Sequence, residues 1–171
     1  DAAVHAFGQD ANFKTNSSIP INKMATAINS QLKYSIRIKN AEEVDIGFHS
    51  RYNCKEKTYA YVINNEEQAS AIFRNMEYHF PKKLDSAIYR NLEYNIKMPL
   101  DVNKMQEAAN YFVGEHDFAG FKASGTSSKS SVRTIYNAEV VENNGRIIIK
   151  LTGNGFLYNM VRIISGTLLE V

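Results

Sequence analysis

Cysteine, tryptophan and proline are scarce in this sequence. Cys54 is the only cysteine among 171 residues, tryptophan is absent, and there are three prolines. A single thiol cannot form an intrachain disulfide or a multi-cysteine zinc site, so we expect a reducing, cytoplasmic setting. The sequence also lacks an apolar run long enough to span a bilayer and a charged-then-apolar leader, and we therefore expect no membrane association.

Charge of either sign is moderate. The formal net charge is +2 and the sequence pI is about 8.6, with 22% charged and 44% hydrophobic residues. These values are typical of a globular protein and exclude disordered and collagen-like classes. The small positive excess is compatible with a nucleic-acid partner and equally with a metabolic enzyme, so only the placement of the charges can distinguish them.

The length allows one hydrophobic core, or two small halves that share a sheet. In the first forty residues the pattern predicts a strand, a helix of about three turns and a second strand, over Val4–Phe13, Ile21–Leu32 and Ser35–Lys39. The chain begins abruptly at Asp1 and stops inside an apolar helical pattern, so we expect both ends to be truncated.

The middle of the chain gives one clear strand and one clear helix. Lys57–Asn64 alternates with Tyr59 and Ile63 on one face, which predicts a strand. Asp101 is a good N-cap for an apolar stripe that ends at Gly114, which predicts a helix. The segment from 66 to 98 shows no single period.

Two further strands are predicted at Val132–Glu142 and Arg146–Thr152. They flank Asn143-Asn144-Gly145, whose Asn-Gly pair tolerates the positive φ angles of a tight hairpin. Before them, Lys122–Ser131 contains five serines, a threonine, a glycine and two lysines. We expect a surface loop that is too polar to bury and too flexible to hold a shape alone, and an ordinary connector is as good an interpretation as a phosphate-binding loop.

Arg162 lies in an almost uncharged C-terminal helix. Between Phe156 and Val171 the only other charged residue is Glu170. We expect this helix to be buried, with its main apolar face formed by Met160, Ile163, Ile164, Thr167, Leu168 and Val171. A guanidinium there requires a carboxylate, a phosphate or carbonyl groups, or it must extend to water. The preceding Gly153-Asn154-Gly155 lets the backbone approach another group closely, which favours an active-site floor over a core ion pair.

Several short motifs together resemble the tRNA pseudouridine synthase A family. They occur in the family's order along the whole chain, at Asp1–Ala6, Phe48–Arg51, Lys57–Tyr59, Glu115–Phe118, Ser131–Ile135 and Gly153–Arg162. The resemblance implies that Asp1 is the catalytic aspartate, that Arg162 is its ion-pair partner and that Tyr59 stacks on the base. Without it, Tyr59 would be interpreted as a packed core aromatic and Asp1 as a disordered terminal residue.

The resemblance also implies an α+β fold. Two ferredoxin-like (RRM-like) halves would share a mainly antiparallel sheet, with residues 1–47 ending the N-terminal half and residues 48–171 forming most of the C-terminal half. The family is homodimeric and binds tRNA across both subunits. Ala3 stands where the family usually has glycine, and the family's segments before the aspartate and after the last helix are missing, so we expect this piece alone to be inactive.

The implied reaction converts uridine to pseudouridine at positions 38, 39 and 40 of the tRNA anticodon stem-loop. The glycosidic bond breaks and C1′ rejoins at C5, so neither a metal nor a redox cofactor is required. Asp1 could add to C6, attack C1′ or take a proton from C2′, and Arg162 would keep it ionised. Tyr59 would stack on the flipped base and could assist removal of the C5 proton.

Cationic side chains are expected to hold the RNA backbone. The candidates are Arg51, Lys55, Lys57, Lys122, Lys129 and Arg133, and for some of them solvated surface charge is the better interpretation. His49, His116 and Asp117 offer no recognised metal-ligand spacing, so no metal site is expected. Two other functions stay open: a noncatalytic RNA-binding module built on a ferredoxin-like sheet, and a metabolic α+β enzyme whose site contains the Arg162 pair.

Overall fold

The computed structural model describes residue 6 and residues 8–33, 36–65, 77–79, 93–96, 98–125 and 128–171, with only the backbone for 77–79 and 93–95. The chain divides into two compact units. One is Ala6–Cys54, and the described part of the other lies within Lys55–Val171. Each described helix is too short or too polar to cross a membrane.

The smaller unit contains helix α1, Ile21–Asn29, as the apolar spacing predicted. Met24 is its buried residue. At the end of the helix the Asn29 side chain binds the backbone of Ile38, accepting from its N–H at 2.8 Å and donating to its carbonyl at 2.9 Å. Asn12 similarly accepts from the backbone N–H of Ser50 at 2.9 Å. Amide side chains therefore fix the loops of this unit.

Two strands predicted in this unit are not found in its described residues. Residues 8–13 and 36–39 have no strand, while Val4, His5, Phe7 and Ser35 lie outside the described residues. Alternation of apolar residues forms a strand only where a neighbouring strand satisfies the backbone. At Ile38 the Asn29 side chain supplies those hydrogen bonds instead.

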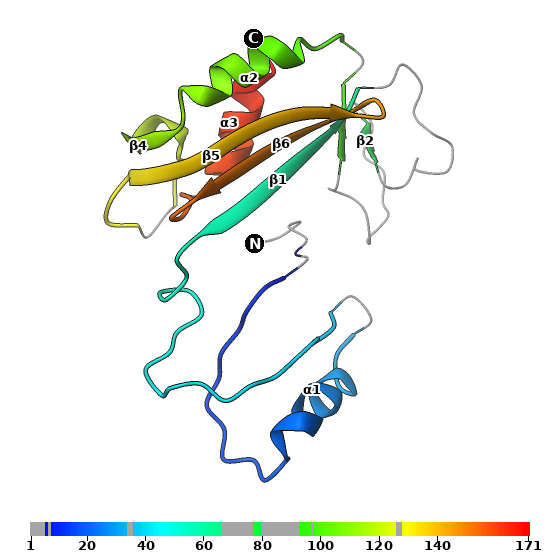
Figure 1. Cartoon of the computed structure of the whole chain (residues 1–171), viewed down its shortest axis with the longest axis vertical. Helices are drawn as coiled ribbons and strands as arrows, with labels where there is room; N and C mark the ends of the chain where they lie inside the picture. Colours follow the sequence, from blue (N-terminus) through cyan, green and yellow to red (C-terminus); the bar gives the residue numbers. More distant parts are fainter. Residues whose placement is uncertain are drawn as a thin grey trace. The chain divides into compact units, whose positions relative to one another are not determined.

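The larger unit is built on a six-stranded sheet with the order β2-β3-β1-β6-β5-β4 (Figure 1). Its strands are β1 (Lys57–Asn64), β2 (Glu77–His79), β3 (Glu93–Asn95), β4 (Gly114–Asp117), β5 (Val132–Asn143) and β6 (Arg146–Gly153). The four strands β1, β6, β5 and β4 pair antiparallel, whereas β3 pairs in parallel with β1 and β2 pairs in parallel with β3. A mixed α/β fold with a mainly antiparallel sheet is thus confirmed; β2 and β3 fall in the segment that the sequence left unassigned.

The β5–β6 hairpin turns at the predicted residues. Asn144 has φ 51° and Gly145 has φ 70°, so both central residues adopt the left-handed conformation of the tight turn. A bulge in the register lies between Ile135 and Asn137. The strong local turn signal therefore set the hairpin register as expected.

Helices α2 (Val102–Asn110) and α3 (Met160–Leu168) cover one face of this sheet (Figure 1). The Asp101 side chain caps α2 by accepting from the backbone N–H of Lys104 at 3.1 Å. The helix ends at Asn110, before the predicted Gly114. The core between helices and sheet includes Ile63, Met105, Ala109, Ile147, Ile149, Leu151, Met160, Ile164 and Leu168.

The buried face of α3 differs from the predicted one. Met160, Val161, Ile164, Ser165 and Leu168 are buried, whereas Arg162 and Thr167 are exposed. Three residues of the predicted face, Met160, Ile164 and Leu168, are thus buried as expected, but the helix is covered on one side only. Hydrophobicity alone could not select the face because apolar residues, Val161 and Ile163, lie on both sides of the central stripe, and packing against the sheet made the choice.

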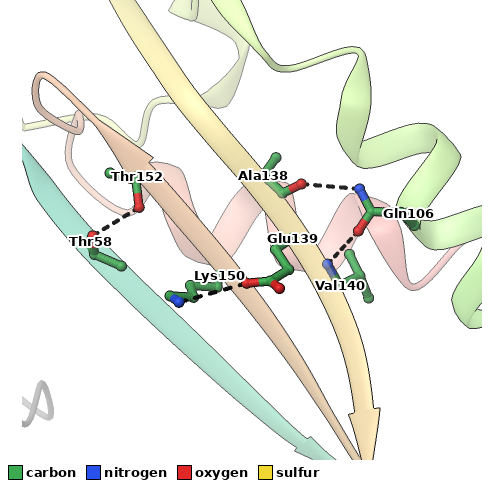
Figure 2. A network of polar contacts seen from close by, with 7 residues as sticks. All are labelled: Thr58, Gln106, Ala138, Glu139, Val140, Lys150 and Thr152. Atoms are coloured by element: carbon green, nitrogen blue, oxygen red, sulfur yellow. Dashed lines mark hydrogen bonds and ion pairs between the residues drawn. The ribbon is translucent and has the colours of Figure 1, made fainter.

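Helix α2 also covers the edge of β5 where β4 no longer pairs with it. The Gln106 side chain donates to the carbonyl of Ala138 at 3.0 Å and accepts from the N–H of Val140 at 2.6 Å (Figure 2). One amide side chain thus satisfies a donor and an acceptor as a neighbouring strand would. On the opposite face Lys150 pairs with Glu139 at 3.7 Å, and each side chain is a little under half exposed (Figure 2).

Replacing Gln106 with methionine should destabilise the protein. The change keeps the side-chain length but leaves the Val140 N–H and the Ala138 carbonyl without their partner, so we expect a loss of about 1–3 kcal/mol in the free energy of unfolding. Urea unfolding measures it. The exposed neighbour Glu107, changed to methionine, is the control and should shift stability by less than about 0.5 kcal/mol. Equal effects of the two changes would contradict the edge-covering role.

Candidate nucleic-acid interface

One end of the sheet brings together the turn and the loop that the sequence singled out. Strand register aligns Lys57 of β1 with Gly153 of β6, and Gly153 with Ile135 of β5. The polar loop Lys122–Ser131 enters β5 at this end, and the turn from Gly153 leads into α3. These segments form the candidate site, called here the basic end of the sheet.

Gly153 allows the turn to lie against β5. A Cβ atom built there would be 2.6 Å from the carbonyl oxygen of Thr134, a separation that real Cβ atoms essentially never show. Asn154 secures the contact, because its N–H donates to the Thr134 carbonyl and its Oδ1 accepts from the Thr134 N–H, each at 3.0 Å. The close backbone approach predicted for this turn is confirmed, and its partner is the start of β5.

The described residues of the polar loop are exposed or half-buried and none is fully buried, as predicted, and both described ends are fixed. The N–H of Ala123 donates to the carbonyl of Tyr158 at 3.1 Å, and the carbonyl of Ser131 accepts from the N–H of Phe118 at 3.0 Å. Residues 126 and 127 lie outside the described residues. Backbone bonds to neighbouring segments thus hold the two ends, as expected of a loop that does not hold a shape alone.

Asp117 contributes to the same end of the loop. A hydrogen bond from the Ser131 side chain, and a second from the Ala119 N–H at 3.0 Å, lower the pKa of this carboxyl below its ordinary value of 3.8. The attraction of Lys122 acts in the same direction. An ionised Asp117 thus joins the end of β4 to the start of β5. The sequence grouped Asp117 with two histidines and gave no sign of Ser131 as its partner.

Arg133 is half-buried and contacts the loop that precedes it. Its Nη1 donates to the carbonyls of Ser130 at 3.0 Å and Val132 at 2.6 Å, and its Nη2 donates to Ser128 Oγ at 2.7 Å. The guanidinium is therefore already engaged by the protein. Ser128 was not singled out from the sequence, because one serine among five carries no separate signal.

The other predicted cations differ in exposure. Lys55 and Lys129 are exposed, whereas Lys57 and Lys122 are half-buried. By connectivity and register all four belong to the basic end of the sheet, together with Arg133. Arg51 belongs to the Ala6–Cys54 unit, where its guanidinium lies 6.0 Å from the Tyr52 ring centroid.

Tyr59 is half-buried on the helix-covered face of β1. Its ring meets Phe156 edge to face, with centroids 5.1 Å apart and an interplanar angle of 76°. Phe156 lies in the segment that leads into α3, so this aromatic pair connects β1 to the approach to Arg162. The core-packing interpretation of Tyr59 and a base-stacking role are compatible, since the ring is only partly covered.

Arg162 lies in the first turn of α3 on the exposed side of the helix. Within the described part of the chain no hydrogen bond or ion pair to it is found. Asp1 lies outside the described residues, so the predicted Asp1–Arg162 pair stays a prediction. An exposed guanidinium beside an otherwise apolar helix can accept an anionic partner without a large desolvation cost.

No group of three or more His, Cys, Asp or Glu side chains suited to a metal ion occurs among the described residues. Two histidines, His116 and His49, contact protein groups instead. His116 Nε2 lies 3.0 Å from the Val113 carbonyl, and His49 Nδ1 accepts from the N–H of Arg51 at 3.2 Å.

The fold and the site together define a mixed α/β domain in which one end of the sheet carries a polar loop and several cationic side chains. A family model described as tRNA pseudouridine synthase matches residues 108–171, which include the polar loop, the β5–β6 hairpin and α3. Three curated relatives, each called tRNA pseudouridine synthase A, match the chain over its full length. Their identities are 45% over 171 residues in Acetivibrio thermocellus, 48% over 172 in Ruminiclostridium cellulolyticum and 46% over 171 in Clostridium acetobutylicum.

Over its whole length the chain is similar to proteins called tRNA pseudouridine synthase A, and its residues 108–171 match the model of the tRNA pseudouridine synthase family. These matches include 100% of this chain but 64% of the length of each of the three relatives. The chain thus spans slightly less than two thirds of the length of the relatives that it matches.

Changing Gly153 to alanine should disrupt the basic end of the sheet. The added methyl group would meet the Thr134 carbonyl, so the turn must move away from β5, at a cost of roughly 1–3 kcal/mol in stability. Gly155 to alanine is the matched control, because its Cβ would lie 3.8 Å from Arg133 Nε, an ordinary contact. Chemical unfolding of both variants checks this, and a fully stable Gly153→Ala protein would contradict the close approach.

Proposed function

We propose that the full-length protein to which this chain belongs converts uridine to pseudouridine in tRNA. The observation that carries the proposal is the match of the whole chain, at 45% identity, to a relative called tRNA pseudouridine synthase A. The geometry of the basic end supports it, because an exposed guanidinium, an aromatic pair and a loop with an exposed lysine occur on connected segments.

The proposed chemistry uses Asp1, Arg162 and Tyr59. The glycosidic bond between C1′ and N1 breaks, the uracil turns, and C1′ bonds to C5, while the C5 proton leaves to solvent and N1 takes up a proton from solvent. Asp1 is the nucleophile, and Arg162 holds its carboxylate ionised and oriented through opposite charge. Tyr59, supported at its edge by Phe156, stacks on the base. Atoms and electrons balance without a redox partner.

The RNA partner is proposed to be the anticodon stem-loop of tRNA, with uridines 38, 39 and 40 as substrates. Lys55, Lys57, Lys122 and Lys129 are proposed to contact its phosphates, together with Arg51 from the other unit. The same proposal includes a cytoplasmic homodimer with tRNA bound across both subunits, and two ferredoxin-like halves of which residues 1–47 and 48–171 form parts.

Asp1→Asn should separate catalysis from binding. The substitution keeps the shape but removes the anionic nucleophile, so in the full-length protein we expect tritium release from C5-labelled uridine in tRNA to be abolished. The affinity for tRNA should stay within roughly threefold of the wild type, because the substitution leaves the cationic side chains that are proposed to bind the phosphates unchanged. Filter binding and tritium release measure the two quantities on one preparation.

Asp10→Asn is the matched control for this experiment, since Asp10 is an exposed carboxylate in the same part of the sequence. It should keep normal turnover. Full activity in Asp1→Asn would show that this aspartate is not the nucleophile, and a wild-type protein that binds tRNA without releasing tritium would favour the noncatalytic RNA-binding module.

Lys129→Met should weaken tRNA binding in a salt-dependent manner. Each lost phosphate contact lowers the slope of log K against log salt by about 0.7–0.9, since fewer counterions are released. Titrations over a salt series measure the slope. Lys104→Met is the control, because Lys104 is an exposed cation of α2 that pairs with Asp101 at 3.8 Å. An unchanged slope in Lys129→Met would indicate that the polar loop only connects two segments and does not contact the RNA.

A further inference from the structure

The contacts of Arg133 differ from those of a side chain whose guanidinium has no protein acceptor and could bind a phosphate directly. Its guanidinium donates to the Ser130 carbonyl, the Val132 carbonyl and Ser128 Oγ. These contacts engage three of the five N–H groups that a guanidinium offers. The three acceptors lie at the end of the polar loop and on the first residue of β5. The side chain of Arg133 therefore hydrogen-bonds to the segment that directly precedes it.

The loop segment around Arg133 is ordered by further hydrogen bonds. Ser128 Oγ donates to the Ser130 carbonyl at 2.8 Å, so that carbonyl accepts from both Ser128 and Arg133. The N–H of Val132 donates to Ser130 Oγ at 3.2 Å. Lys129 lies between these two serines, and its own side chain is exposed. The network therefore fixes the backbone on both sides of the lysine.

The stem of Arg133 also contacts the turn before α3. A Cβ built on Gly155 would lie 3.8 Å from Arg133 Nε and 3.9 Å from its Cδ, so the side chain passes over this glycine. Neither Gly155 nor the adjacent Asn154 carries a charge that could attract the guanidinium. Arg133 thus connects the polar loop to the turn through packing as well as hydrogen bonds.

We propose that Arg133 is a positioning residue that fixes the polar loop so that Lys129 is presented to tRNA. This proposal rests on the proposed function for the RNA partner, and it gives Arg133 a different role from the direct phosphate contact expected from the sequence. A planar, multidentate guanidinium suits the role because it reaches two carbonyls and a hydroxyl at once, which a single ammonium group cannot do in the same geometry.

The loop itself provides the first test, without any RNA. In Arg133→Met, and in Ser128→Ala, the backbone amide of Val132 should exchange its hydrogen faster than in the wild type, because each change removes one side of the network. Ser128→Ala alters no charge, so it separates loop order from electrostatics. Exchange at Val132 that is unchanged in Arg133→Met would overturn the proposal.

Binding provides the second test, through a double-mutant cycle in the full-length protein. Arg133→Met and Lys129→Met should each raise KM for tRNA about three- to tenfold, and kcat should stay within about twofold. A merely structural defect would reduce the folded fraction and hence kcat. Because Arg133 acts through the loop that carries Lys129, the double variant should lose about as much affinity and salt slope as Lys129→Met alone.

The opposing result is additivity. If Arg133 binds a phosphate directly, the double variant loses a second increment of about 0.7–0.9 in the salt slope, Ser128→Ala binds tRNA normally, and the proposal fails. The two proposals can fail separately. A wild-type protein that releases no tritium from tRNA would refute the proposed function, whereas the hydrogen-exchange rates test the role of Arg133 in the loop without RNA.

Discussion

Strand β6 lies between β1 and β5 and pairs with both along its length. Its inward residues Ile147, Ile149 and Leu151 are at most 1% exposed and form the centre of the core. Full burial of such side chains contributes roughly 1.5–3 kcal/mol each. Because β6 ends at Gly153, this pairing also decides where the turn, the start of α3 and the start of β5 meet.

Two charged side chains of opposite sign organise the loop at this end of the sheet. Asp117 accepts from Ser131 on the β4 side, and Arg133 donates to Ser128 and Ser130 on the loop side. Charge-assisted hydrogen bonds are the stronger ones, and they let a polar segment keep a defined conformation without burial in a core. A loop held in this manner can present an exposed lysine while losing little conformational entropy on binding RNA.

Local signals predicted those elements whose structure depends mainly on neighbouring residues. The Asn-Gly turn set the hairpin, Asp101 capped α2, and alternation in Lys57–Asn64 predicted β1 with the bounds that the structure has. The strand expected at Ser35–Lys39 is absent from its described residues because no strand pairs with it and Asn29 binds Ile38 instead. The buried face of α3 was predicted only in part, because Val161 and Ile163 extend the apolar surface on both sides of the central stripe and the sheet selected the side of Val161.

The sequence by itself determined the hairpin, the capped helix, the close-packed glycine turn and the motifs that indicate the family, since each depends on residue type at short spacing. Only the tertiary structure decided which partner each polar side chain has. Gln106 and Ala138, Asn154 and Thr134, and Asp117 and Ser131 are separated by 32, 20 and 14 residues, respectively, and meet only after the sheet has formed. Arg133 looked from its sequence like any other surface cation, and the fold surrounds its guanidinium with acceptors from the polar loop, because a guanidinium binds whichever oxygens the fold brings within reach.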